Sequence, residues 1–344
     1  MNHPQNSRVR QILSNHGYNP LDIKDILQIG GGFNNEIFEL SVNNRRLVIK
    51  IYPQKNDAQS RKIKEATFID SCSKNKIKAV PIIADVLEGS NAILFEKIEG
   101  KTIVPSELKP VHIDQMKTFL TDLGALETAN YNDDGSQIFA TDFSFTREEF
   151  INNFNVRVKN LKFLTKKYDP NSIIRTRLPD IEKLSKQLIR DLNKSKSIVF
   201  RNENNPKNFE RLISPSDFGL HNSLIDKTGT INFIDFEYAG IDDPANLILD
   251  TFINTDAGLP STLLDEFIVL FHNYDGLREK IELLSPLFGL KWVCIVLKRC
   301  FFIGNLQTRD SFYGEHGGEI VKENVEKLDL LFEKCRKAKI FDIK

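Results

Sequence analysis

Three oxygen-bearing side chains follow one another at short spacing in the second half of the chain: Asp217, Asn222 and Asp235. A carboxylate can accept or orient the proton of an attacking hydroxyl, and carboxylate and amide oxygens are suitable ligands for Mg²⁺. Each residue alone is explained as well by a turn, a loop or a strand end. Together, and in this order, they predict a base and a magnesium site of the kind that phosphoryl transfer needs.

The elements around these residues indicate how the three side chains can meet. Because Pro215 opposes a helix, Asp217 and Asn222 are expected on a loop. Residues 223–234 then read as two short strands joined by a tight turn. This hairpin would fold Asp235, at the end of its second strand, back beside Asn222.

The same segment resembles the catalytic loop and metal-binding motif of the aminoglycoside phosphotransferase and choline kinase-type superfamily, whose fold is protein-kinase-like. In that family, His-Gly-Asp is followed by an Asn five residues after the Asp, and then by a strand ending in Asp-Phe or Asp-x-Glu. The resemblance implies that Asp217 is the catalytic base and that Asn222 and Asp235 bind Mg²⁺. Glu237 gives the Asp-x-Glu form of choline-kinase-like members, and Asp243 begins the Asp-Pro pair that follows the motif.

The chain departs from the family at the start of this loop, where Pro215 and Ser216 stand in place of His and Gly. In the family this His mostly supports the loop geometry, so the base itself is retained. The departure keeps open a second class of function, a catalytically impaired, pseudokinase-like module that binds nucleotide. Against that reading, all the residues expected to bind the metal and to act as the base are present.

The resemblance places the binding of ATP in the first hundred residues. Gly31, Gly32 and Asn35 match the Gly-Gly-x-x-Asn loop of the family. Glycines let backbone N–H groups approach phosphates, although a glycine-rich hairpin turn is the alternative explanation. Lys50 matches the strand lysine that pairs the α- and β-phosphates.

Two further features complete the expected nucleotide site. Glu65, on a helix expected over residues 58–73, is the candidate carboxylate partner of Lys50; the alternative is an ordinary surface glutamate. The strand that ends near Glu96 and Ile98 resembles the hinge of the family, where adenine bonds to the backbone. The cofactors implied are therefore ATP and Mg²⁺.

The order of the elements predicts an α+β fold with two lobes, of the protein-kinase-like kind. Strands dominate from residue 23 to residue 98, with Asn43 and Asn44 as a hairpin turn. Helical periodicity dominates afterwards. We therefore expect a small β-rich N-lobe at residues 1–98, and a larger, mostly helical C-lobe at residues 99–344 that holds the catalytic loop, the metal site and the acceptor site.

Composition and charge limit the possible partners. Lys plus Arg and Asp plus Glu both number 47, so the chain lacks the basic surplus that nucleic-acid-binding proteins usually carry. No apolar run reaches the roughly 18 residues of a membrane span, and the chain begins with a polar segment. The four cysteines are scattered, which fits a reducing compartment. We expect a cytoplasmic protein that binds neither nucleic acid nor membrane; its oligomeric state is left open.

The acceptor is expected to be a hydroxyl of a small molecule. An aminoglycoside is a polycation and needs an acidic wall, for which the candidates are Glu237, Asp242, Asp243 and Asp256. Choline needs an aromatic cage, for which the candidates are Tyr238, Trp292, Phe312 and Tyr313. Neither set stands out from an ordinary surface or core, so the sequence favours a sugar or sugar-like metabolite, with choline, ethanolamine and aminoglycosides as alternatives.

Overall fold

The computed structural model describes residues 4–31, 35–53, 57–133, 136–167, 173–200, 209–304 and 317–341. Contacts divide the chain into two compact units. Unit 1 comprises residues 1–141 and 213–241, and unit 2 comprises residues 142–212 and 242–344. The mixture of strands and helices confirms the α+β class. The lobe boundary expected after residue 98 stays a prediction.

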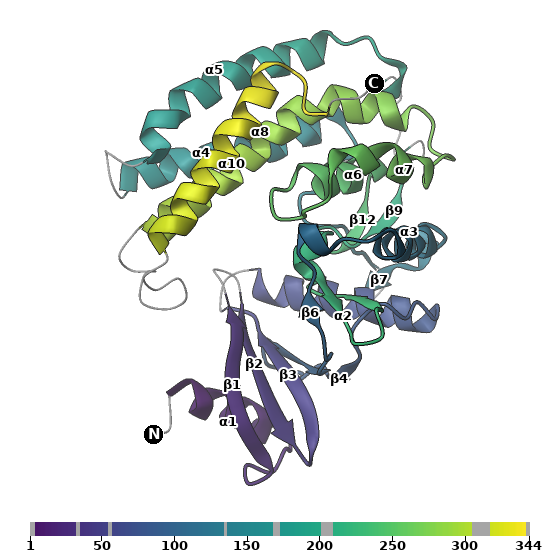
Figure 1. The fold of residues 1–344 in the computed structure, drawn as a ribbon, viewed down its shortest axis with the longest axis vertical. Helices are drawn as coiled ribbons and strands as arrows, with labels where there is room; N and C mark the ends of the chain where they lie inside the picture. The colour runs from purple at the N-terminus through teal and green to yellow at the C-terminus, as the bar shows by residue number, and fades with distance from the viewer. Residues whose placement is uncertain are drawn as a thin grey trace. The chain divides into compact units, whose positions relative to one another are not determined.

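A five-stranded antiparallel sheet forms the first part of unit 1, in the order β1-β2-β3-β5-β4 (Figure 1). Asn43 and Asn44 join β2 to β3 with φ angles of 50° and 62°. Asparagine tolerates this left-handed conformation, which two-residue hairpin turns require, so the hairpin expected there is confirmed. The strand bounds are β1 Ile23–Gly31, β2 Glu36–Val42, β3 Arg45–Ile51, β4 Ile83–Asp85 and β5 Ala92–Glu96.

The sheet buries a hydrophobic core together with helix α1 (Pro4–Asn15). Val9 and Leu13 of α1 are fully buried and belong to the same cluster as Phe38 and Leu40 of β2. In β2 the buried residues alternate with half-buried ones, as expected for a strand whose two faces meet different surroundings. Packing of this kind fixes the register of β3, the strand that carries Lys50.

Helix α2 (Ala58–Lys74) lies within one residue of the expected bounds. It buries three charged side chains, Arg61, Lys62 and Glu65, beside the apolar Phe68. Charged side chains are rarely buried without partners. Their burial on α2 therefore indicates a polar site against this helix rather than an ordinary core.

The rest of unit 1 supports the hairpin of residues 223–234. Its two strands pair as expected, and β6 extends them into a three-stranded sheet in the order β11-β10-β6. Phe119 of α3 stacks on Phe233 with ring centroids 4.5 Å apart and on Phe218 at 5.9 Å. Aromatic packing thus holds the loop and the hairpin against α3.

The remaining elements from residue 101 to residue 137 and from residue 212 to residue 242 are short apart from α3. β9 pairs with β12, and β7 pairs with β8. The bounds are β6 Lys101–Thr102, η1 Pro105–Glu107, α3 Pro110–Gly124, η2 Thr128–Asn130, β7 Asn132–Asp133, β8 Ser136–Gln137, β9 Leu212–Ser214, η5 Leu220–Asn222, β10 Ser223–Ile225, β11 Ile231–Phe233 and β12 Gly240–Asp242.

Unit 2 is helical and is built around α8, which packs against α4, α5, α6 and α10 (Figure 1). Because α8 has neighbours on several sides, its apolar residues surround the helix rather than forming one stripe. The bounds are α4 Arg147–Lys167, α5 Ile173–Lys194, η3 Ile198–Phe200, α6 Pro244–Ile253, η6 Ser261–Leu263, α7 Leu264–Val269, α8 Leu277–Gly304 and α10 Gly317–Arg336.

The Asp-Pro pair that follows the hairpin begins helix α6. Asp243 Oδ1 accepts the N–H of Ala245 at 2.8 Å, and Pro244 occupies the first helical position, where a missing N–H costs nothing. Asp243 also forms an ion pair with Lys280 of α8. One carboxylate therefore caps α6 and joins it to the central helix of unit 2.

Replacing Asp243 by Ala should lower the free energy of unfolding by about 2 kcal/mol or more, because the cap is lost and Lys280 is left mostly buried without its carboxylate. Thermal unfolding measures the change. Asp191→Ala, at an exposed position on α5, is the control and should stay within about 0.5 kcal/mol of the native chain. Equal midpoints for the Asp243 variant and the native chain would contradict this role.

Candidate active site

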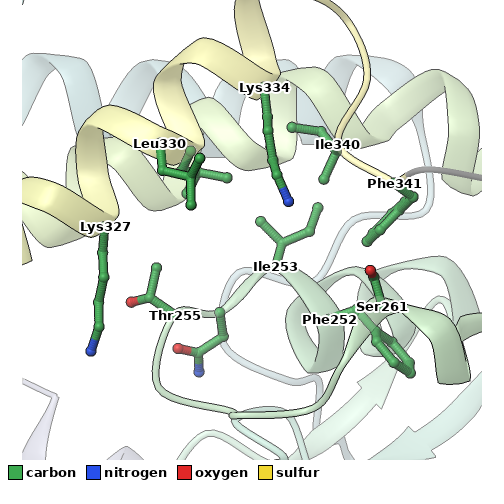
Figure 2. A pocket seen from close by; sticks show the side chains of 11 residues that line it. Phe252, Ile253, Thr255, Ser261, Lys327, Leu330, Lys334, Ile340 and Phe341 are labelled. Carbon is green, nitrogen blue, oxygen red and sulfur yellow. The ribbon is translucent and has the colours of Figure 1, made fainter.

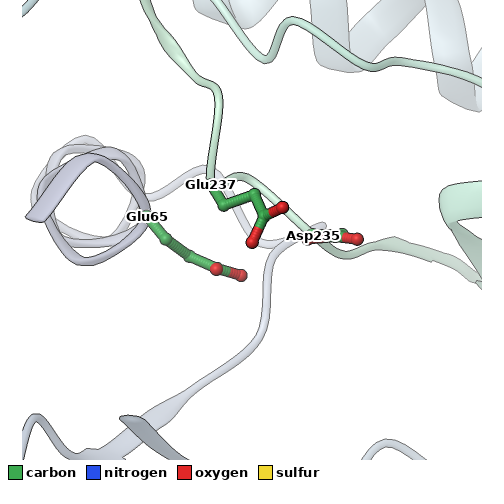
Figure 3. Close-up of side chains that lie close together, drawn as sticks. All are labelled: Glu65, Asp235 and Glu237. Carbon is green, nitrogen blue, oxygen red and sulfur yellow. The ribbon is translucent and has the colours of Figure 1, made fainter. Parts of the chain in front are cut away.

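The ammonium group of Lys50 lies among three carboxylates. Its Nζ donates to Glu65 Oε2 at 2.6 Å and to Asp235 Oδ1 at 2.5 Å, and it lies 3.5 Å from Glu237 Oε2. Carboxylate oxygens of the three acids lie within 4.8 Å of one another. Figure 3 shows Glu65 on α2, whereas Asp235 and Glu237 follow β11. The ion pair expected between Lys50 and Glu65 is thus present, and Asp235 joins it.

Electrostatics keep this lysine charged although it is only 4% exposed. Burial alone would lower the pKa of Lys50, but the carboxylates of Asp235, Glu65 and Glu237 outweigh burial and hold its pKa well above the ordinary value. Burial raises the pKa of Glu65, and the ammonium of Lys50 opposes that rise. The cluster is therefore held by mutual neutralisation of buried charges.

Glu65 receives further hydrogen bonds that compensate for its burial. The hydroxyl of Tyr52 donates to Oε2 at 2.5 Å, and the backbone N–H of Phe236 donates to Oε1 at 3.3 Å. The ring of Phe236 stacks on Phe68 of α2 at 4.4 Å. The residue that follows Asp235 is therefore attached to α2 through both its backbone and its side chain.

Glu237 is almost completely buried, with 1% exposure, and Arg61 and Asn35 are among the residues besides Lys50 that hold it. Arg61 Nη1 donates to Oε1 at 3.1 Å, and Asn35 Nδ2 donates to Oε2 at 2.7 Å. The sequence shows Glu237 only as part of a motif variant and shows Arg61 as one of several cations on a helix. Their contact joins residues 176 positions apart, which spacing along the chain cannot reveal.

The loop over residues 215–222, which is predicted to be the catalytic loop, forms a second group of polar contacts. Asp217 has a partly exposed side chain, whose Oδ1 lies 3.1 Å from His221 Nε2. Asn222 Nδ2 donates to the backbone carbonyl of Asp217 at 2.9 Å, which directs the amide oxygen of Asn222 away from that carbonyl. The family motif assigns no role to His221, although its position four residues after Asp217 is a signal for this contact.

Serine residues shape the loop at the place where the family has His-Gly. The N–H of Ser216 donates to the hydroxyl of Ser214 at 3.0 Å, and Ser216 has a φ of 66°. The hydroxyl of Ser223 donates to the carbonyl of Gly219 at 2.8 Å. These bonds give the loop local support in the absence of the family histidine.

The hairpin joins the two groups of side chains. The N–H of Ile234 donates to the carbonyl of Asn222 at 2.9 Å. Asp235, the next residue after Ile234, therefore lies one residue from this pairing. Asp235 has a φ of 68°, where the chain leaves the strand direction. The register expected from the sequence is therefore the one observed.

The remaining residues expected at the nucleotide site, apart from Asn35, have other contacts than those of the Lys50 cluster, or lie outside the described residues. Gly31 ends β1 opposite Glu36, Gly32 lies outside the described residues, and the buried Asn35 belongs to the Glu237 contacts. Glu96 ends β5, where it pairs with Arg45 and its N–H donates to Ile82. In the described ranges no hydrogen bond joins Gly31, Glu96 or Ile98 to the Lys50 cluster, so their nucleotide roles stay predictions.

The acidic residues considered for binding a polycation already have partners within the chain. Asp256 pairs with Arg299 at 2.5 Å, Asp243 pairs with Lys280, and Glu237 is held as described above. Asp242 is 4% exposed and accepts from Asn246 at 2.8 Å; burial raises its pKa to about 8.

Of the aromatic residues considered for a choline cage, Trp292 is 8% exposed and donates its Nε1–H to Asp250 at 3.0 Å. Phe312 and Tyr313 lie outside the described residues. Tyr238 is partly buried, and burial, with Glu237 adding to the effect, raises its pKa. Trp292 is therefore explained by packing.

A pocket of about 210 Å³ lies in unit 2, beside the end of α6 and the last turns of α10 (Figure 2). Ile253, Leu331 and Phe341 contribute apolar surface, and Lys327 and Lys334 contribute ammonium groups. None of the residues selected from the sequence lines this pocket, and we assign it no role.

The sequence matches the family model described as the Phosphotransferase enzyme family over residues 25–279. This match covers most of the chain, and the protein belongs to this family. A comparison with curated proteins found no match.

Solved structures share the fold at low sequence identity. A choline kinase from Cryptosporidium parvum Iowa II aligns with a TM-score of 0.56 and 16% identity, over 95% of this chain and 96% of that one. The ADP-bound aminoglycoside phosphotransferase APH(2″)-Ib gives 0.58 and 14%, over 94% and 98%. The Plasmodium vivax ethanolamine kinase Pv091845 gives 0.57 and 16%, over 93% and 88%. These likenesses confirm the kinase-like α+β fold.

None of the helices in the described part of the chain combines the length and hydrophobicity that a bilayer-spanning segment requires.

Replacing Lys50 by Met should lower the free energy of unfolding by about 3–5 kcal/mol at pH 8, because three carboxylates lose their shared cation. Without the ammonium of Lys50, which opposes the effect of burial, the pKa of Glu65 would rise further in the folded variant, so the folded state would take up a proton more readily than the unfolded state. The deficit should therefore shrink as the pH falls from about 8 to about 5.

Urea unfolding across this pH range measures the effect. Lys74→Met, which removes the exposed partner of Asp70 on the same helix as Glu65, is the control and should change stability little at any pH. A deficit of the same size at both ends of the range would argue against the charge cluster as its origin.

Proposed function

We propose that this protein transfers the γ-phosphoryl group of ATP to a hydroxyl group of a small molecule. The observation that carries the proposal is the buried ammonium of Lys50, paired with Glu65 and also in contact with Asp235. A lysine held in this way, beside a carboxylate suited to Mg²⁺, is an arrangement that positions and neutralises nucleotide phosphates. Membership of the Phosphotransferase enzyme family and the ADP-bound structural neighbour support the same conclusion.

The chain offers a donor set that suits Mg²⁺. Asp235 has a side chain that is 35% exposed, and the amide of Asn222 has its nitrogen engaged and its oxygen as the remaining acceptor. Among the described residues, the cluster joins three carboxylates, of which Asp235 is partly exposed, to the two cations Lys50 and Arg61, so its excess charge is negative. We assign Asp235 and Asn222 as the residues that would hold Mg²⁺, which supplies neutralisation of phosphate charge when it is bound.

Asp217 is assigned as the base. It accepts or orients the proton of the acceptor hydroxyl while the hydroxyl oxygen forms a bond to the γ-phosphorus and the bond to the β-phosphate oxygen breaks, leaving ADP. His221, 3.1 Å from Asp217, would orient this carboxylate. Lys50 would hold the α- and β-phosphates in place throughout the transfer.

The remaining assignments follow the family resemblance. Gly31, Gly32 and Asn35 would form the loop beside the phosphates, and the backbone near Glu96 and Ile98 would bond adenine. A small β-rich lobe at residues 1–98 would bind the nucleotide, and a helical lobe at residues 99–344 would hold the catalytic loop, the metal site and the acceptor site.

Experiment must identify the class of the acceptor. The neighbours are named for choline, ethanolamine and aminoglycosides, and nothing in the comparisons supports the sugar that the sequence favoured. The acidic residues considered for an aminoglycoside have partners within the chain. We therefore test amino alcohols, aminoglycosides and sugars side by side.

The test is a screen for ADP release from Mg-ATP with each class of acceptor, followed by the mass of the product. The proposal requires one acceptor to gain a single phosphoryl group with matching ADP release. Stabilisation by Mg-ATP without turnover on any acceptor would favour the pseudokinase-like module. Addition of AMP to the acceptor would contradict phosphoryl transfer.

Asp217→Asn should lower kcat by several orders of magnitude, about 10³-fold or more, because an amide cannot accept the proton. Stabilisation of the variant by Mg-ATP in thermal unfolding should persist, since Lys50 and Asp235 are untouched. Asp122→Asn, at an exposed position on α3, is the matched control and should keep native activity. Near-native turnover by the Asp217 variant would refute its assignment as the base.

A further inference from the structure

The buried Glu237 differs from Asp235 in how its oxygen atoms are used. Arg61 donates to Oε1 at 3.1 Å, and Asn35 donates to Oε2 at 2.7 Å, with the ammonium of Lys50 at 3.5 Å from the same Oε2. Asp235 is 35% exposed, whereas the side chain of Glu237 is 2% exposed. Both oxygens of Glu237 are therefore already engaged by donors inside the protein.

We propose that Glu237 is a positioning residue rather than a ligand of the metal, and that Arg61 and Asn35 hold it in place. The carboxylate would act through its neighbours, by fixing the chain two residues after Asp235 and by helping to neutralise Lys50. The part of this inference that concerns Mg²⁺ rests on the proposed function; the part that concerns the buried contacts does not.

The energetics of burial support a fixed pair. Arg61 is 3% exposed and Glu237 is 1% exposed. Loss of either would leave a buried charge with fewer partners, including Lys50 and Asn35 for Glu237 and the exposed Asp57 for Arg61. Burial alone would lower the pKa of Arg61, but the carboxylate of Glu237 outweighs burial and raises it. A metal ion that took Glu237 as a ligand would have to share an oxygen with a buried guanidinium or amide donor.

The contacts of Glu237 also reach two separate parts of unit 1. Arg61 lies on α2, four residues before Glu65, and Asn35 is the first described residue after the glycine-rich segment. One carboxylate therefore attaches both the helix that carries Glu65 and the end of that segment to the chain carrying Asp235. This arrangement explains why a buried glutamate is needed at position 237 even if it never contacts the metal.

The first experiment is a double-mutant cycle on the free protein, without metal or nucleotide. Arg61→Met and Glu237→Gln should each lower the midpoint of thermal unfolding by about 4 °C or more. The midpoint of the double variant should be no lower than that of the less stable single variant. Arg61→Lys keeps the charge and should recover part of the loss. The exposed pair Lys101 and Glu107, replaced by Met and Gln, is the matched control and should show little coupling. Additive losses for Arg61 and Glu237 would overturn the positioning role.

The second experiment distinguishes a positioning role of Glu237 from a ligand role by the direction in which Arg61→Met changes the requirement for Mg²⁺. The readout is the Mg²⁺ concentration that gives half of the stabilisation by ATP. If Arg61 positions Glu237, Arg61→Met and Glu237→Gln should both raise this concentration, by about tenfold, as loss of supporting contacts around a metal site does. If Glu237 were instead a ligand for which Arg61 competes with the metal, Arg61→Met should lower the concentration or leave it unchanged, and that result would overturn the proposal.

A failure of the proposed function and a failure of the positioning role give different results in these experiments. A native protein that gains no stability from Mg-ATP would contradict the proposed function, while the double-mutant cycle would still test whether Arg61 holds Glu237. Conversely, additive losses in the cycle would remove the positioning role and leave the phosphotransferase proposal intact.

Discussion

The site depends on one interaction, the contact of the Lys50 ammonium with carboxylates from two distant parts of the chain. Glu65 lies 15 residues from Lys50 and Asp235 lies 185 residues away, so their meeting requires the sheet, α2 and the hairpin to be correctly assembled. Each of these charges is costly to bury alone, and each compensates for the others. The cluster therefore couples the folding of unit 1 to the construction of the site.

Around this interaction, apolar packing positions the backbone, and hydrogen bonds orient the polar side chains. Phe119, Phe218 and Phe233 stack beneath the catalytic loop and the hairpin, while Phe236 stacks on Phe68 of α2. These contacts place the backbone, and the polar side chains then need only short-range adjustment. Asp217 and Asp235 remain partly exposed, as their proposed roles of base and metal ligand require.

Local signals in the sequence predict a large part of this arrangement. The order of Asp217, Asn222 and Asp235, with a hairpin turn between them, predicts their relation because the turn and strand lengths leave little freedom. The Asn43-Asn44 turn and the helix over residues 58–73 follow from equally local rules, and the Lys50–Glu65 pair follows from the family resemblance. In contrast, the acceptor depends on shape, and no short motif specifies shape.

The sequence does not reveal the long-range partners of the side chains on helix α2. Arg61, Lys62 and Lys64 look alike as cations on a helix, yet Arg61 pairs with Glu237, and Lys62 donates to the carbonyls of Leu87 and Ser90 at 2.9 and 2.8 Å. A long side chain can be solvated or buried at the same helical position, and only the fold decides which. The contact of Asn35 with Glu237 was equally inaccessible, because its family match indicates a loop beside phosphates rather than a partner 202 residues away.

The most direct test of the central claim is an experimental structure with Mg²⁺ and a non-hydrolysable ATP analogue. Our account predicts that Lys50 keeps its contact with Glu65 while its ammonium reaches the α- and β-phosphates, and that the carboxylate of Asp235 moves from Lys50 to the metal. A nucleotide bound away from Lys50, or a complex in which Asp235 stays on Lys50 and the metal is held elsewhere, would contradict it.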